Sequence, residues 1–173
     1  MTNAEGNRRW AAALVGTVLI TVAASSGSAQ TYSRLYSFQC TPDGESPAVG
    51  VVRDSLGNVY GTTNLGGTFG QGTVFKLSPA NTETVLHSFA GGPGDGSYPQ
   101  GNLTLDGAGN LYGVTQSGGT FSNGAVFKVT SSGSETVLYS FTGSFDGGNP
   151  IGGLVRDAAG NLYGTTADGG GWS

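Results

Sequence analysis

Few residues in this chain could support catalysis or metal binding. The chain contains one histidine, His87, and one cysteine, Cys40. A hydrolytic site needs a nucleophile with a base, paired carboxylates or metal ligands, and one residue of each kind cannot supply the three protein ligands of zinc. His87 takes the place of Tyr36 and Tyr139 in a recurring Leu-x-Ser-Phe segment, so we interpret it as a strand residue, with a catalytic or ligand role as the alternative. The sequence therefore predicts no catalytic residue, no metal site and no cofactor.

Recurring aspartates are the better candidates for binding an ion. Oxygen ligands for Ca²⁺ could be assembled from their loops and nearby carbonyls. However, Asp also caps turns through its own side chain, and no copy has the Asp-x-Asp-x-Asp spacing of a dedicated calcium loop. We therefore interpret these residues as turn formers. They fall into two sets, with Asp43, Asp95 and Asp146 in Asp-Gly loops and Asp54, Asp106 and Asp157 at the start of Gly-Asn hairpins.

Three aromatic residues recur just after pairs of glycines. These are Phe69, Phe121 and Trp172. Aromatic side chains on loops of a rigid scaffold are common binding elements, so one hypothesis is that they form a rim that binds a carbohydrate or a protein. The other hypothesis, which the sequence leaves equally open, is that they fill the cores between repeated units.

Composition indicates a folded protein that does not bind nucleic acid. Glycine accounts for 33 of the 173 residues, but 10% of residues are aromatic and the net charge is only −4, unlike a disordered chain. Seven Lys and Arg face eleven Asp and Glu with no basic cluster, so the electrostatic footprint of a nucleic-acid-binding protein is missing.

The first residues have the order of a secretory signal peptide. Arg8 and Arg9 precede an apolar run from Trp10 to Ala24, which is followed by small residues up to Ala29. The apolar run is shorter than the roughly 18–20 residues of a membrane-spanning helix. We predict a signal peptide over residues 1–29 and an extracytoplasmic protein, secreted or on the cell surface. The alternative is that this segment is not cleaved and serves as an N-terminal membrane anchor. We expect membrane contact only through this segment or through an anchor outside the given sequence.

Residues 30–173 contain an internal repeat of about 51 residues. The spacings between equivalent residues are 51 and 52, both for Phe38, Phe89 and Phe141 and for Tyr60, Tyr112 and Tyr163. The repeats cover about 36–86, 87–138 and 139–173, and the last one is incomplete. Such a period is the signature of a repeat architecture.

Each unit is predicted to be a four-stranded antiparallel meander. In Gly124–Val129, Ala125, Phe127 and Val129 would point to one face of a strand and Val126 and Lys128 to the other, a pattern typical of a strand whose two faces differ in burial. The Asp-x-x-Gly-Asn linkers and the Ser78–Thr82 segment predict hairpins. The fold class is therefore all-β, with units matching the blades of an incomplete β-propeller; a parallel β-helix is the alternative. Too few blades are present for a ring, so we expect either a fragment or self-association of short chains. Residues 32–38 are predicted to form a strand completing the last blade.

Several spaced motifs recur in the repeats. They are Gly124-Ala-Val-Phe-Lys128, Leu138-Tyr-Ser-Phe141, Asp146-Gly-Gly-Asn-Pro150, Gly153-Leu-Val-Arg-Asp157 and Gly160-Asn-Leu-Tyr-Gly-Thr-Thr166. In these motifs the chain resembles the GloVer tandem-repeat family of bacterial exported proteins. The resemblance covers residues 32–173 and implies an exported or surface-attached repeat protein, often carrying a C-terminal anchoring segment, with no established activity.

The sequence leaves more than one function open. The main hypothesis is a non-enzymatic binding or structural module of the cell surface, because its polar residues recur whereas a catalytic set is singular. The alternative is a fragment of an enzymatic propeller, a hydrolase or lyase acting on polysaccharide, whose catalytic residues lie in other blades. An adhesin-like array stabilised by Ca²⁺ is a third hypothesis.

Overall fold

The computed structural model describes residues 13–14, 18–19, 32–47 and 49–171, and the strands in these residues confirm the predicted all-β class. Two four-stranded antiparallel sheets account for most of the strands. The first sheet contains β3 (Val52–Arg53), β4 (Val59–Thr63), β5 (Thr73–Leu77) and β6 (Glu83–Ser88). The second sheet contains β7 (Gly96–Leu105), β8 (Leu111–Gly118), β9 (Ala125–Val129) and β10 (Glu135–Ser140). Two short pairs complete the strands, β1 (Ala13–Leu14) with β2 (Val18–Leu19), and β11 (Val155–Arg156) with β12 (Leu162–Tyr163).

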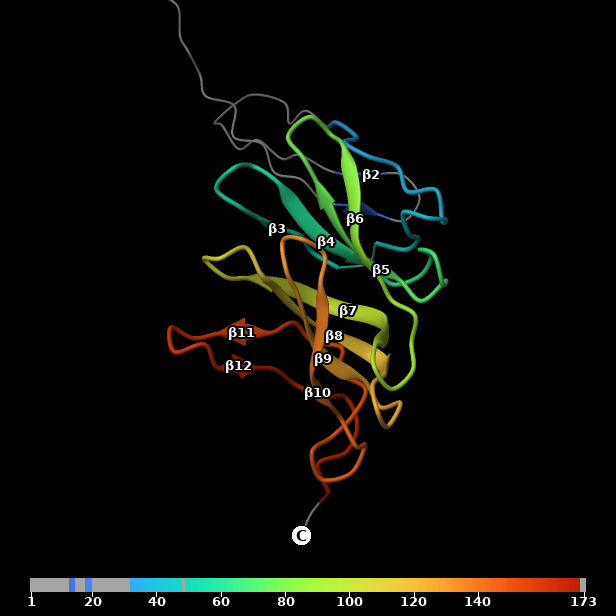
Figure 1. The fold of residues 1–173 in the computed structure, drawn as a ribbon, viewed down its shortest axis with the longest axis vertical. Helices are drawn as coiled ribbons and strands as arrows, with labels where there is room; N and C mark the ends of the chain where they lie inside the picture. Colours follow the sequence, from blue (N-terminus) through green and yellow to red (C-terminus); the bar gives the residue numbers. More distant parts are fainter. Residues whose placement is uncertain (1–12, 15–17, 20–31, 48, 172–173) are drawn as a thin grey trace, which may run out of the picture.

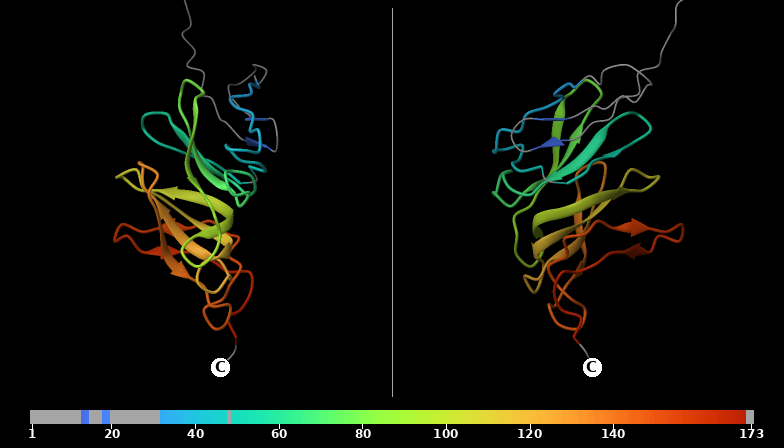
Figure 2. Two further views of the ribbon diagram at one scale, coloured as in Figure 1. Left: turned by 45° about the vertical axis from the view of Figure 1, so that its right-hand side comes forward. Right: turned by 180° about the vertical axis from the view of Figure 1, so that it is seen from behind.

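The two sheets follow one another along the long axis of the molecule, as Figure 1 and both views of Figure 2 show. One face of the second sheet packs on the first sheet, and its other face packs on the β11–β12 hairpin. The described part of the chain forms no closed ring. It also holds no helix long and apolar enough to cross a membrane.

Within each sheet the strands are adjacent in chain order, so the predicted meander is confirmed. The predicted hairpins are present as well: the Asp54 amide bonds the Asn58 carbonyl, and the Ser78 amide bonds the Thr82 carbonyl. Residues 32–38 form no strand in this structure, and their place in the last blade of an intact ring stays a prediction. Backbone pairing needs a neighbouring strand, and the described residues place none beside this segment.

The strand β9 shows the predicted alternation of buried and less buried side chains. Ala125, Phe127 and Val129 are fully buried, whereas Val126 and Lys128 are partly exposed. Because successive side chains point to opposite faces of a sheet, the first three residues face the first sheet and Val126 faces the β11–β12 hairpin.

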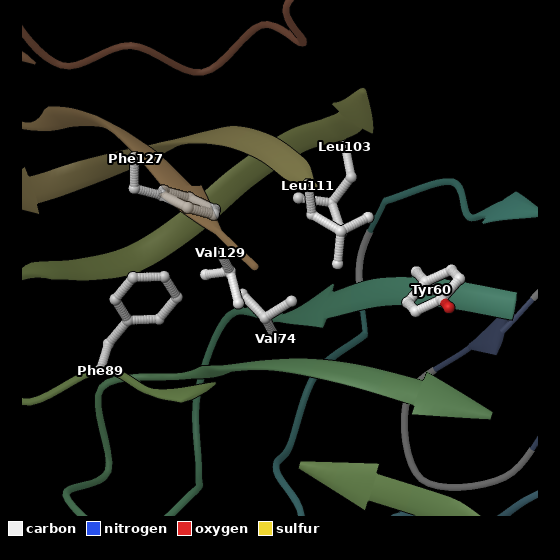
Figure 3. Close-up of a cluster of buried hydrophobic side chains, with 7 residues drawn as sticks. All are labelled: Tyr60, Val74, Phe89, Leu103, Leu111, Phe127 and Val129. Atoms are coloured by element: carbon white, nitrogen blue, oxygen red, sulfur yellow. The ribbon is translucent and has the colours of Figure 1, made fainter. Parts of the chain in front are cut away.

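The main core lies between the two sheets, and Figure 3 shows its side chains. The Phe89 ring, which follows β6, meets the Phe127 ring edge-on, with centroids 5.0 Å apart and planes at 66°. Such contacts add to the roughly 1.5–3 kcal/mol that burial of each large apolar side chain contributes. The buried members of the cluster are Tyr60, Val74, Phe89, Leu103, Leu111, Phe127 and Val129.

Glycines in the central strands leave room for aromatic rings. Gly61 pairs with Phe75 and Gly113 pairs with Phe127 across the sheets. A Cβ atom on Gly113 would lie 2.5 Å from the Phe127 ring, and one on Gly61 would lie 2.7 Å from the Phe75 ring. The close neighbour that each of these strand glycines accommodates is thus an aromatic side chain rather than another backbone.

Replacement of Phe127 by alanine should destabilise the fold by about 3–5 kcal/mol, because it leaves a cavity in the inter-sheet core. The change is measured as the difference in unfolding free energy from urea titrations. Phe121→Ala is the matched control, because this ring is 54% exposed, and it should change stability by less than about 0.5 kcal/mol. Equal losses in the two variants would contradict this assignment of the core.

Candidate functional site

Each of the hairpins β3–β4, β7–β8 and β11–β12 contains an aspartate that accepts the same set of hydrogen bonds. In the second sheet, the Asp106 carboxylate accepts bonds from the Asn110 amide (2.8 Å), the Asn110 side chain (2.9 Å) and the Tyr112 hydroxyl (3.0 Å). Asp54 and Asp157 accept the equivalent three bonds in their own hairpins. The interpretation of these aspartates as turn formers is confirmed.

Hydrogen bonds keep the Asp106 carboxylate ionised. Burial raises the pKa of this group, but bonds from Asn110 and Tyr112 outweigh burial and bring the pKa down to about 2. In return, burial and the bond to Asp106 raise the pKa of Tyr112. Because the tyrosine body is buried and its hydroxyl holds the turn, one residue couples the hairpin to the core.

The second set of aspartates, Asp43, Asp95 and Asp146, holds loops closed where one repeated unit meets the next, a boundary that we call the seam. The Asp95 carboxylate accepts bonds from the Ala90 amide (2.7 Å) and the Gly96 amide (2.7 Å), and lies 3.1 Å from Nε2 of His87. In the other copies a tyrosine hydroxyl replaces the imidazole, donating to Asp43 (2.6 Å) and to Asp146 (2.8 Å). His87 lies in β6, so its interpretation as a strand residue in the place of tyrosine is confirmed.

Two of these aspartates each have a nearby glutamate that the sequence patterns did not single out. Glu83 lies near Asp43, and Glu135 lies near Asp95. Glu135, the first residue of β10, has a carboxylate oxygen within 4.8 Å of ligand atoms of both His87 and Asp95. Burial and the nearby Asp95 charge raise the pKa of Glu135 to about 7, against the effect of His87. Glu83 recurs 52 residues earlier in the same Glu-Thr-Val-Leu segment. That repeat of an acidic residue at the start of a strand was the signal that could have found it.

The Glu83 carboxyl is costly to ionise in the folded protein. Burial and the Asp43 charge raise its pKa to about 7, and its Oε1 atom is buried without a hydrogen-bond partner. Folding therefore favours the protonated form of this group.

The glycine pairs shape the loops that carry the rim aromatics. Gly66, Gly67, Gly118 and Gly119 all have positive φ, between 71° and 80°. The next residue in each loop donates its amide to a serine hydroxyl at the end of the sheet, Thr68 to Ser88 (2.8 Å) and Thr120 to Ser140 (3.2 Å).

The rim aromatics themselves are solvent-exposed. Phe69 is 58% exposed and Phe121 is 54% exposed, so the alternative that they fill the cores between units is wrong for these two. Trp172, the third predicted rim residue, lies outside the described residues.

A cleft of about 400 Å³ lies between the second sheet and the β11–β12 hairpin. Its lining includes Phe141, Leu154, Leu162 and Gly164. One repeat earlier, the equivalent residues surround the Phe127 ring in the inter-sheet core. The cleft therefore has the lining of an inter-sheet core without the central ring.

Replacing Asp106 with alanine should destabilise the protein by about 2 kcal/mol at pH 7, because the hairpin loses several hydrogen bonds to a charged acceptor. The folded-state pKa is lowered, so the contribution of Asp106 is present above about pH 4 and is lost as pH falls toward 2. Urea titrations at pH 7 and pH 2.5 measure both effects. Asp157→Ala in the exposed third hairpin is the control and should cost less; an equal loss would contradict the coupling to the core.

Replacing Glu83 with glutamine should stabilise the protein at pH 8 by roughly 1–2 kcal/mol and leave it unchanged at pH 4. Because the folded-state pKa is raised, the stability that Glu83 contributes is fully present below about pH 4.5 and is lost as pH rises to about 7. Melting temperatures between pH 4 and 8 measure the effect. Glu45→Gln, at an exposed position, controls for loss of one charge, and parallel curves for wild type and Glu83→Gln would contradict the prediction.

Comparison with known proteins identifies the family. No curated protein matches the sequence. Residues 15–173 match the Gloeobacter/Verrucomicrobia repeat, which spans both sheets and the β11–β12 hairpin. The recurring aspartate turns, the glycine–phenylalanine pairs and the rim loops all lie within the matched residues, and the chain belongs to the Gloeobacter/Verrucomicrobia (GloVer) repeat family.

Proposed function

We propose that this protein is an exported, non-enzymatic binding module built from propeller-type blades, and that the loops carrying Phe69 and Phe121 bind carbohydrate. The charged, apolar and small segments at the start of the sequence support export. Export places the binding loops outside the cytoplasm, where cell-envelope polysaccharides are accessible.

The observation that carries the proposal is the exposed aromatic pair. A large aromatic ring that is more than half exposed buries little apolar surface, so packing does not account for its recurrence. Phe69 and Phe121 stand at equivalent positions of consecutive units, on loops that the same serine bond holds in place. Rigid loops reduce the entropy lost when a ligand binds.

The stacking of the sheets supports the propeller arrangement. Neighbouring blades of a propeller are four-stranded meanders packed face to face around an axis. The first and second sheets have this topology and share a core. Equivalent loops of successive blades would then lie on the same side of the ring, which brings the rim aromatics into one surface.

The repetition of the polar groups supports a binding role over an enzymatic one. Each of Asp54, Asp106 and Asp157 is bound within its own hairpin and does the same structural work in each copy. Catalysis requires a singular constellation of acid, base and nucleophile. The competing function remains a hydrolase or lyase acting on polysaccharide, with its catalytic residues in further blades.

Co-sedimentation of the purified chain with insoluble cellulose, chitin and xylan tests the proposal. We expect binding to at least one of these polymers, with no release of reducing ends. The Phe69→Ala and Phe121→Ala variants should each weaken it about tenfold, equivalent to about 1.4 kcal/mol. Leu56→Ala removes an exposed side chain from the β3–β4 turn at the other end of the first sheet and should leave binding unchanged. Binding that survives loss of both rings would contradict the rim assignment, and release of reducing ends would favour the enzymatic function.

A further inference from the structure

One polar cluster at the seam between the two sheets differs from its counterparts. His87 lies in β6, Asp95 lies in the loop that follows β6, and Glu135 begins β10 of the second sheet. Their ligand atoms all lie within 4.8 Å of one another, and Nε2 of His87 is 3.1 Å from Oδ1 of Asp95. The cluster therefore joins residues of both sheets.

The equivalent cluster in the first repeated unit differs from this one in a single residue type, because a tyrosine stands in the place of His87. There Tyr36 donates its hydroxyl to Asp43, and Glu83 is near enough for the Asp43 charge to act on it. In the third copy Tyr139 again donates to Asp146. A tyrosine satisfies the aspartate but is a poor ligand at neutral pH, whereas a neutral imidazole is among the commonest metal ligands. Only the middle copy thus combines an imidazole with two carboxylates.

Apart from the imidazole of His87, the two carboxylates of the middle copy have no cationic side chain as partner. Oε1 of Glu135 is buried and has no hydrogen-bond partner. In the part of the chain that the structure describes, no lysine or arginine forms an ion pair with a carboxylate. Buried charge without a partner is unfavourable, and a bound cation would compensate both groups.

The donor set selects the kind of cation. Ca²⁺ prefers six to eight oxygen ligands, while imidazole with carboxylates suits zinc and related transition metals. Zinc sites with three protein ligands keep a fourth position for water. The Ala90 and Gly96 amides, which bond the Asp95 carboxylate, hold that ligand in orientation as outer partners do in metal sites.

We propose that His87, Asp95 and Glu135 bind one divalent transition-metal ion of the zinc class, which links the two sheets. The ion takes the place of the proton between Nε2 and Asp95, and the imidazole carries its proton on Nδ1. Ligand atoms around tetrahedral zinc lie about 3.4 Å apart, so Glu135 must move inward by at most about 1.4 Å from the 4.8 Å limit, which a change of side-chain rotamer supplies. The site is independent of the rim that carries the proposed binding function.

Metal titrations of the untagged, chelator-treated full chain test the proposal. Calorimetry with Zn²⁺ should give one ion per chain, and Co²⁺ should give visible absorption bands of a low-coordinate site. With Zn²⁺ at a hundred times its dissociation constant, the melting temperature should rise by about 5–10 °C. Failure of Zn²⁺ to bind at millimolar concentration would overturn the proposal and leave His87 as a hydrogen-bond partner alone.

His87→Tyr is the sharpest variant, because it recreates the arrangement of Tyr36 and Tyr139 and should preserve the metal-free melting temperature. It should weaken zinc binding by more than about a hundredfold, since loss of an outer partner alone costs 10–100-fold. Glu135→Gln should also lose the zinc-dependent shift. Cys40→Ser removes the exposed thiol and should keep it. An unchanged shift in His87→Tyr or Glu135→Gln, or its loss in Cys40→Ser, would place the ion elsewhere and overturn the proposal.

Discussion

The structure depends on an aromatic ring that one unit contributes to the core of the next. Phe89 follows the last strand of the first sheet, yet its ring packs against Phe127 in the second sheet. Phe127 can occupy that position because Gly113, its cross-strand partner, has no side chain. Phe38 and Phe75 repeat the arrangement one unit earlier, with centroids 4.9 Å apart. The glycine, the ring above it and the ring from the preceding unit therefore form one interlocking set.

The aspartate hairpins connect this core to the loops at the sheet ends. Tyr60 is buried in the inter-sheet cluster, and its hydroxyl bonds Asp54 in the β3–β4 turn. Tyr112 repeats the connection on the opposite face of the second sheet. Because the amphipathic ring serves core and turn at once, the turn geometry is coupled to sheet packing. The glutamates at the seams instead oppose sheet packing when they ionise, since a charged Glu83 carboxylate is unfavourable in its buried position.

Local sequence patterns were sufficient to predict most of the fold. Alternation within Gly124–Val129 and the Asp-x-x-Gly-Asn linkers predicted strands and hairpins, because both depend on residues within one unit. The membership of the GloVer family likewise follows from motifs that recur at a constant spacing. The repeat period and the turn residues were thus sufficient to predict the architecture of each individual sheet.

Contacts between units could not be predicted in the same way. Glu135 approaches His87 and Asp95 only after two sheets have stacked, and although its recurrence with Glu83 marks the position, the recurrence does not show which residues it approaches. The exposure of Phe69 and Phe121 also depends on which sheet faces are covered, and residues 32–38 had a strand pattern but no adjacent strand. Sequence periodicity locates equivalent residues, but it does not state what lies between consecutive copies.

Because each core draws its rings from two consecutive units, the seam is a more meaningful unit of stability than the repeat. An isolated repeat holds two half-cores and no complete one. In such a one-dimensional array the free energy is approximately a sum of nearest-neighbour terms. Stability then accumulates with each added seam, and loss of structure proceeds inward from whichever end is least well packed.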